Sequence, residues 1–112
     1  MSKQPRWPFG VAAIIALAIA ATVAHEVDNS RTVITLTGTP AADATLNLTL
    51  AEGLEPGAEV FVKWTCGATA YDLVLGTGCE TKTIDGTISK TTVVHLVFDG
   101  TRYVVVNVSV AY

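Results

Sequence analysis

Apolar and polar side chains alternate with a period of two along most of the chain after Arg31, and no other feature of the 112-residue sequence constrains the fold more strongly. Residues 45–50 place three leucines on one face and Thr45, Asn47 and Thr49 on the other. Successive side chains of a β-strand point to opposite faces, so this segment predicts a strand with one buried and one wet face. Similar patterns occur at residues 31–39, 58–65, 71–75 and 91–98.

β-Branched residues dominate these segments, turn residues recur between them, and no sustained helical period follows Val27. Half of all residues are apolar and only 15% are charged, a composition typical of a folded domain with one small core. The sequence therefore predicts an all-β fold, a small antiparallel sandwich or barrel-like domain over residues 31–112. Residues 27–30 would form the linker that precedes it.

Two Asp-Gly pairs indicate hairpin turns, because Asp and Gly tolerate the positive φ angles of a two-residue turn. Asp99-Gly100 separates two alternating apolar runs, which predicts a hairpin from about Val93 to Tyr112. Asp85-Gly86 is a second and shorter candidate.

The N-terminal segment is strongly apolar, and the 18 residues from Trp7 to Ala24 carry no charged side chain. A helix needs roughly 17–25 such residues to span a bilayer. Lys3 and Arg6 precede the segment and acidic residues follow it, so the positive-inside rule places residues 1–6 in the cytoplasm. The pattern predicts a single-pass transmembrane helix over residues 7–26, with Trp7 and His25 at the membrane interface and lipid as a partner. The domain after it would be periplasmic or extracellular.

Two other interpretations of this segment stay open. The basic start, the apolar centre and the small residues before His25 are also typical of a cleaved signal peptide. The pair Phe9-Gly10 followed by an apolar run resembles the leader and filament helix of type IV pilins, a resemblance that implies a surface filament.

Cys66 and Cys79 are the two cysteines, with twelve residues between them. In an exported protein an even pair of cysteines predicts a disulfide. Closing a loop of this length would stabilise the fold by about 3 kcal/mol. We therefore expect a Cys66–Cys79 disulfide.

Composition and motifs argue against several chemical functions. The net charge is −3 and the basic residues are scattered, so no surface for nucleic acid is indicated. No nucleophile–base arrangement and no phosphate-binding loop is recognisable. His95 lies within a predicted strand, where a cross-strand hydrogen bond is its expected role. We expect a non-enzymatic protein without a cofactor, a metal or a small-molecule substrate.

Residues 45–108 resemble a β module that recurs in phage tail-fibre, tail-spike and virion-surface proteins. The resemblance begins with "TLNLTLAEGLEPGAEVFVKW", continues with "GTGCETKTIDGT" and closes with "TTVVHLVFDGTRYVVV". It includes the turn at residues 83–86 and the turn at residues 99–101, with Tyr103 as the aromatic residue that follows. The resemblance implies a structural or attachment role and trimeric assembly.

The composition of the last predicted strand indicates how such a domain would interact with other proteins. Its residues are apolar on both faces, which implies a central strand or burial against a partner. The candidate assembly face consists of Tyr103, Val104, Val106, Val108 and Val110. We expect a membrane-anchored structural protein whose β domain packs against copies of itself or a larger assembly, such as a filament, a spike or a virion. The alternative is a single-helix accessory subunit of a respiratory or photosynthetic membrane complex.

Overall fold

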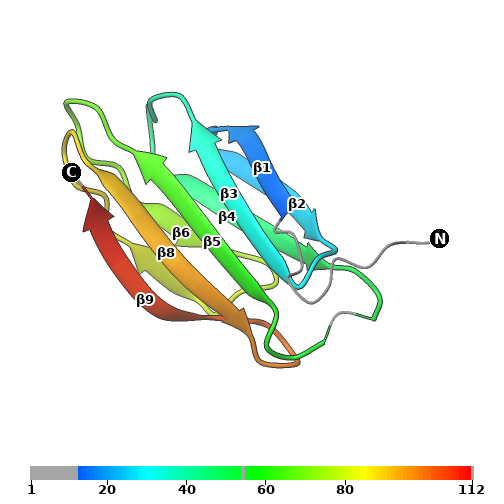
Figure 1. Ribbon diagram of the computed structural model, residues 1–112. Coiled ribbons are helices and arrows are strands. Elements are labelled where there is room, and N and C mark those ends of the chain that lie inside the picture. The colour runs from blue at the N-terminus through cyan, green and yellow to red at the C-terminus, as the bar shows by residue number, and fades with distance from the viewer. Residues whose placement is uncertain (1–12, 54, 112) are drawn as a thin grey trace.

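The computed structural model describes residues 13–53 and 55–111, and all regular structure in these residues is β (Figure 1). The strands are β1 (Ala13–Ala18), β2 (Thr22–Val27), β3 (Arg31–Thr37), β4 (Ala44–Leu50), β5 (Glu59–Thr65), β6 (Leu73–Leu75), β7 (Lys82–Ile84), β8 (Thr91–Phe98) and β9 (Tyr103–Ala111). The predicted all-β character is thus confirmed for the described residues.

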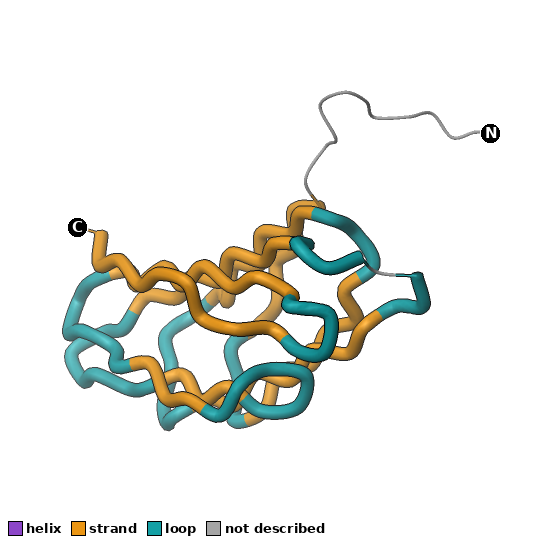
Figure 2. The backbone as a smooth tube through the Cα atoms, turned by 90° about the horizontal axis from the view of Figure 1, so that it is seen from below, coloured by secondary structure: helices purple, strands orange, loops and turns teal. Residues whose placement is uncertain are grey.

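The strands form two layers that pack face to face (Figure 2). The five-stranded sheet has the order β1-β3-β5-β8-β9, and the four-stranded sheet has the order β2-β4-β6-β7. In Figure 1, β1 and β9 lie at opposite edges of the five-stranded sheet. The architecture is therefore a two-layer sandwich.

The prediction of an antiparallel sandwich is wrong, because most neighbouring strands run parallel. β1, β3 and β5 pair in parallel in one sheet, and β2, β4 and β6 do so in the other. From β1 to β6 the chain crosses to the opposite sheet after every strand, so every second strand enters the same sheet in the same direction. Only the later pairs, β5–β8, β6–β7 and β8–β9, are antiparallel.

The core lies between the two sheets and uses the alternating residues that the sequence indicates. Ile34, Leu36, Val60, Val62 and Trp64 face inward from the five-stranded sheet and are at most 2% exposed. Leu46 and Leu48 face them from the four-stranded sheet and are fully buried. Burial of apolar area at about 25 cal/mol per Å² makes this layer the main source of stability.

The predicted transmembrane helix is wrong for the part of it that the structure describes. Residues 13–27 form β1 and β2, and no helix among residues 13–53 and 55–111 is long and apolar enough to cross a membrane. β1 pairs with β3 over its whole length, while Val23 and Val27 of β2 are 5% and 0% exposed in the core. The run is apolar because it supplies strands to a sandwich.

The two expected interface residues have different outcomes. Trp7 and the predicted cytoplasmic tail, residues 1–6, lie outside the described residues. His25 lies on β2 and is half-buried, with Leu48 as its register partner on β4. The expected linker at residues 27–30 is the short turn between β2 and β3, because Val27 ends one strand and Arg31 begins the next.

The hairpin at Asp99-Gly100 is confirmed, since β8 and β9 pair in antiparallel register from Phe98 and Tyr103 outward. Its turn spans four residues rather than two, because Asp99 N–H donates to the Arg102 carbonyl at 3.0 Å. The Asp99 carboxylate accepts hydrogen bonds from the N–H groups of Arg102 and Thr101, and these bonds lower the pKa of that carboxyl.

The hairpin at Asp85-Gly86 is wrong. β7 ends at Ile84 in the four-stranded sheet and β8 begins at Thr91 in the five-stranded sheet. Residues 85–90 therefore carry the chain from one layer to the other. The structure places the positive φ angle of this connection at Ser89, at 58°.

Candidate functional site

The outward face of the five-stranded sheet carries an apolar surface. One row across all five strands joins Ile14, Val33, Phe61, His95 and Asn107 in register. Ile14 is 71% exposed, and the three residues that follow it in the row are half-buried. Val93, Val97 and Val104 lie on the same face beside this row.

His95 packs flat on Phe61 at the centre of that face. The ring centroids are 4.3 Å apart and the ring planes are inclined by 8°. His95 Nε2 lies 3.5 Å from a carboxylate oxygen of Glu59, whose other oxygen lies 3.5 Å from Arg31 Nε. The contact with Glu59 is within ion-pair distance but lacks hydrogen-bond geometry, so Nε2 has no hydrogen-bond partner. The expected cross-strand hydrogen bond is replaced by a cross-strand ring stack.

The outward face of the four-stranded sheet is polar by contrast. Its central strand β4 presents Thr45, Asn47 and Thr49, and the neighbouring β2 presents Thr22 and Glu26. A sheet that faces water normally has this composition. The two layers of the sandwich therefore differ: the outer face of the four-stranded sheet is mainly polar, whereas that of the five-stranded sheet combines apolar side chains with Arg31, Glu59 and Lys63.

A β-bulge in β9 changes the expected assembly face. The register shifts between His95 and Leu96, so Val105 pairs with Leu96 while Asn107 pairs with His95, and Val106 is the extra residue. The bulge breaks the simple alternation of the valines. Val104 faces outward, whereas Val108 and Val110 lie on the core side opposite the buried Val94 and Thr92.

The valines of the bulge and beyond remain accessible although the strand belongs to the sandwich. Val106 is 55% exposed, Val108 is 41% exposed and Val110 is 38% exposed, while Tyr103 at the start of β9 is fully buried. β9 is an edge strand and not a central one. The expected face therefore divides into a core residue, Tyr103, an outward residue, Val104, and the exposed group Val106, Val108 and Val110.

Residues 78–80, from the β6–β7 connection, cover the first part of the β9 edge, and we call them the edge strap. Tyr103 N–H donates to the Gly78 carbonyl at 2.8 Å, and Glu80 N–H donates to the Tyr103 carbonyl at 2.8 Å. Val105 N–H donates to a carboxylate oxygen of Glu80 at 2.6 Å. In the part of the chain that the structure describes, no strand or strap pairs with this edge beyond Val105.

Within the part of the chain that the structure describes, β1 and residues 106–110 of β9 lack the usual protection of edge strands. Natural proteins guard edge strands with charges, proline, short length or a cover, because an open edge recruits further strands. β1 (AIIALA) and residues 106–110 of β9 (VNVSV) contain neither a charge nor a proline. The edges of the four-stranded sheet are guarded, since β2 carries Glu26 and β7 is three residues long and carries Lys82.

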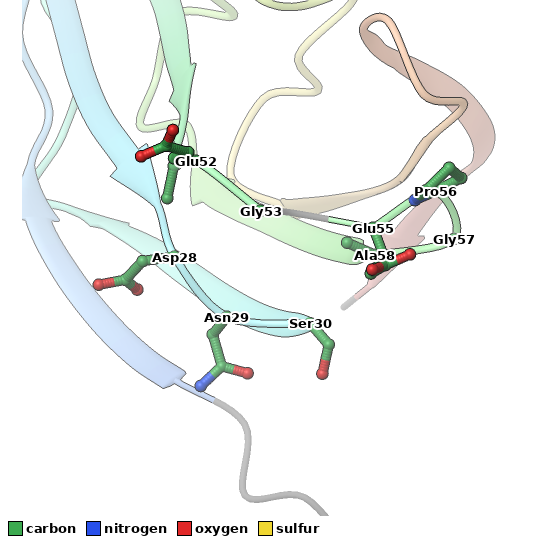
Figure 3. A pocket seen from close by; sticks show the side chains of 10 residues that line it. Asp28, Asn29, Ser30, Glu52, Gly53, Glu55, Pro56, Gly57 and Ala58 are labelled. Atoms are coloured by element: carbon green, nitrogen blue, oxygen red, sulfur yellow. The ribbon is translucent and has the colours of Figure 1, made fainter.

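An open groove of about 400 Å³ lies at one end of the sandwich, between residues 28–30 on one side and residues 51–53 and 55–58 on the other (Figure 3). Asp28, Glu52 and Glu55 line it, and Figure 3 shows their carboxylates spread around it rather than converging on one point. Among the described residues no group of three or more His, Cys, Asp or Glu could hold a metal ion. The groove is acidic, but its geometry defines neither a catalytic centre nor a metal site.

The predicted disulfide is wrong, because Cys66 and Cys79 are separate, buried thiols. Cys66 follows Thr65, which pairs with Thr91 at the start of β8. Cys79 forms a bridge with Tyr103, which pairs with Phe98 at the end of β8. At about 3.3 Å per residue, the two ends of β8 lie about 23 Å apart, far beyond the roughly 7 Å between Cα atoms that a disulfide tolerates. The two cysteines belong to opposite ends of the core.

The environment of Cys79 opposes reactivity. Burial raises the pKa of its thiol to about 11, and the neighbouring Glu80 carboxylate adds to the effect. Burial also raises the pKa of Tyr103 to about 12, and the Tyr103 hydroxyl has no hydrogen-bond partner. A thiol held in its protonated form is a poor nucleophile, so Cys79 serves packing.

Comparison with known proteins returns no match: no protein family, no curated protein and no solved structure is significantly similar to this chain. The resemblance of residues 45–108 to virion-surface modules and that of the N-terminus to pilins therefore stay predictions. Sequence reasoning missed β1, the bulge at Val106 and the edge strap. Residues 13–18 are all apolar and show no alternation with polar residues, so the local pattern did not distinguish β1 from a helix. The edge strap forms between segments that are distant in sequence, so it has no local sequence signal.

Proposed function

We propose that this chain is a non-enzymatic structural protein that packs against copies of itself or a larger assembly through its five-stranded sheet. The observation that carries the proposal is that, among the described residues, β1 and residues 106–110 of β9 carry no charge and have no further strand beside them, while the edges of the other sheet are guarded. Unpaired backbone N–H and C=O groups along an edge bind a further strand readily. A filament, a spike or a virion component would use such edges.

The exposed valines add a driving force to this backbone pairing. Val106, Val108 and Val110 cluster on the uncovered part of β9 and are among the large apolar side chains with the highest exposure. A partner strand that covered them would remove apolar area from water at about 25 cal/mol per Å². The apolar outward face beside them, centred on Phe61 and Val93, extends the surface that a partner could cover. The resemblance of residues 45–108 to virion-surface modules fits the same structural role.

Sedimentation velocity of the full chain, from low micromolar to near-millimolar concentration, tests the proposal. We expect association that increases with concentration. The double variant Val106→Lys/Val108→Lys places charges on the open edge and should weaken association at least about tenfold, equivalent to 1.4 kcal/mol. The matched control Thr22→Lys/Thr83→Lys adds the same charge to exposed positions on the edges of the other sheet and should associate like the wild type.

A chain that stays monomeric over the whole concentration range would overturn self-assembly. If the chain is monomeric alone but co-purifies with a fixed complex, and the valine variant abolishes that co-purification, the partner is a larger assembly. If the lysine variants on both sheets weaken association equally, the added net charge and not the blocked edge causes the loss, which would overturn the assignment of association to the five-stranded sheet.

A further inference from the structure

We propose that the two edges of the five-stranded sheet recognise each other, so that β9 of one copy pairs in parallel with β1 of the next. This inference rests on the proposed function and specifies its partner as a second copy of this chain. Copies joined in this way would form an open, head-to-tail series that extends the sheet from molecule to molecule.

Strand direction makes such a junction possible without any rotation of the second copy. β1, β3 and β5 run parallel, β8 runs opposite to β5, and β9 runs opposite to β8. β9 and β1 therefore point the same way at opposite edges of one sheet (Figure 1). A copy displaced sideways presents its β1 to the β9 edge in parallel, which continues the parallel pairing of β1, β3 and β5.

The lengths of the two edges match. The edge strap covers β9 as far as Val105, which leaves residues 106–110 open before Ala111 ends the strand. β1 has six residues, Ala13–Ala18. A strand of that length fits the open part of β9, and the strap prevents it from pairing nearer to Tyr103. The strap thus limits the register as well as the position of the incoming strand.

The side chains of the two edges also match by face. On the core side, Ile15 and Leu17 of β1 are only partly buried, and Val108 and Val110 of β9 are 41% and 38% exposed. Pairing would place these four side chains next to one another and continue the core across the junction. On the outer side, the same register would place Ile14 beside Asn107 and Ala16 beside Ser109, where neutral side chains create no charge repulsion.

A symmetric dimer of β9 with β9 is the competing arrangement. It would cover the valines, but it would leave β1 uncovered with Ile14 at 71% exposure. Head-to-tail pairing covers both open edges of every interior copy with one type of contact. A contact between two different patches of the same chain closes into a ring only if each copy is rotated by a suitable angle, so copies related by a sideways displacement alone form an open filament rather than a dimer.

Two edge-blocked variants test this arrangement. Val106→Lys/Val108→Lys blocks β9 and leaves β1 intact, whereas Ile14→Lys/Ala16→Lys blocks β1 and leaves β9 intact. Head-to-tail pairing predicts that neither variant associates with itself, while an equimolar mixture forms a heterodimer and nothing larger. The wild type should form a series of larger species. Sedimentation velocity with one variant fluorescently labelled distinguishes these cases.

The outcomes separate this inference from the proposed function. A β1-blocked variant that dimerises alone would show β9–β9 pairing and overturn the inference while self-assembly stands. A mixture that stays monomeric while the wild type associates would do the same. A monomeric wild type would overturn both. Thermal unfolding by circular dichroism controls for misfolding of the variants. A second pair of blocked variants uses exposed positions only: Asn107→Lys/Ser109→Lys blocks β9, and Ala16→Lys/Ala18→Lys blocks β1.

Discussion

The backbone N–H of Tyr103 donates a hydrogen bond to the carbonyl oxygen of Gly78 at 2.8 Å, and this bond attaches the edge strap to the start of β9. Gly78 has a φ angle of +83°, and a Cβ added to it would lie 1.8 Å from the carbonyl oxygen of Leu48. The strap thus passes against β4 of one sheet while it bonds to β9 of the other. It joins the two layers at the side of the sandwich.

Replacing Gly78→Ala should therefore destabilise the protein strongly. The positive φ angle alone costs about 1–2 kcal/mol for alanine. The clash with the β4 backbone adds to this cost, so we expect a total of about 4 kcal/mol or more in the free energy of unfolding. Urea unfolding followed by tryptophan fluorescence measures the change.

Gly53→Ala is the matched control. Gly53 has a similar φ angle of +86°, but no atom lies within 4 Å of the position that a Cβ would occupy. We expect this variant to lose only the backbone cost of about 1–2 kcal/mol. Equal losses at the two glycines would show that the strap does not lie against β4 as described.

The burial of Val27 allows a test of whether strand β2 belongs to the folded core. Val27→Ala removes methyl groups from a fully buried site and should cost about 2 kcal/mol of unfolding free energy. Val106→Ala makes the same chemical change at a site that is 55% exposed and should cost under about 0.5 kcal/mol in the monomer. Chemical denaturation of both variants at high dilution gives the comparison. If residues 22–27 lay outside the folded core, Val27→Ala would have no effect.

The two cysteines should behave as buried free thiols. Adding a reductant should leave the midpoint of thermal unfolding unchanged, because no disulfide joins Cys66 to Cys79. A thiol reagent should label both cysteines rapidly in denaturant and slowly in the native protein, since both side chains are buried. Mass spectrometry of the unreduced chain provides the check. A mass two hydrogens lower, with a reductant-sensitive unfolding midpoint, would contradict the structure.

Alkaline pH should destabilise the protein through Cys79 and Tyr103. Burial raises the pKa of Cys79 from its ordinary 9.0 to about 11 and the pKa of Tyr103 from 10.0 to about 12. Above the ordinary values the unfolded chain binds fewer protons than the native protein, so stability falls as pH rises from about 9 to 12. Below that window both groups are protonated in both states and contribute no pH dependence.

Urea unfolding at a series of pH values measures this decline. Cys79→Ala/Tyr103→Phe removes both ionisable groups and should lose less stability across the window than the wild type. At neutral pH, Tyr103→Phe alone should be neutral or slightly stabilising, because it removes a buried hydroxyl without a hydrogen-bond partner. An unchanged decline in the double variant would assign the pH dependence to other groups.

Sequence reasoning predicted the parts of this fold that depend on local pattern. The period-two pattern that places Val60, Val62 and Trp64 on one side identified a strand, and Asp99-Gly100 identified the hairpin. Local pattern does not specify partners, and so the parallel pairing of β1 with β3, which are separated by the whole of β2, could not be predicted. Packing of side chains across the core determines which sheet each successive strand joins.

The errors have physical explanations as well. Alanine and isoleucine at residues 13–20 suit a membrane helix by hydropathy, and the same residues suit an edge strand beside β3. Asp85-Gly86 has the composition of a hairpin turn, but it follows a three-residue strand that has its partner, β6, on the other side in sequence. The valines of β9 alternate in sequence, and the bulge at Val106 then changes which of them face the core.

Amide hydrogen exchange as a function of protein concentration tests the central claim most directly. If the five-stranded sheet assembles through its open edges, amides at residues 13–18 and 106–110 should gain protection as concentration rises. Amides of β2 and β7, the edges of the guarded sheet, should keep the same exchange rates. Protection that appears on β2 and β7 instead, or no concentration dependence at either edge of the five-stranded sheet, would contradict the account.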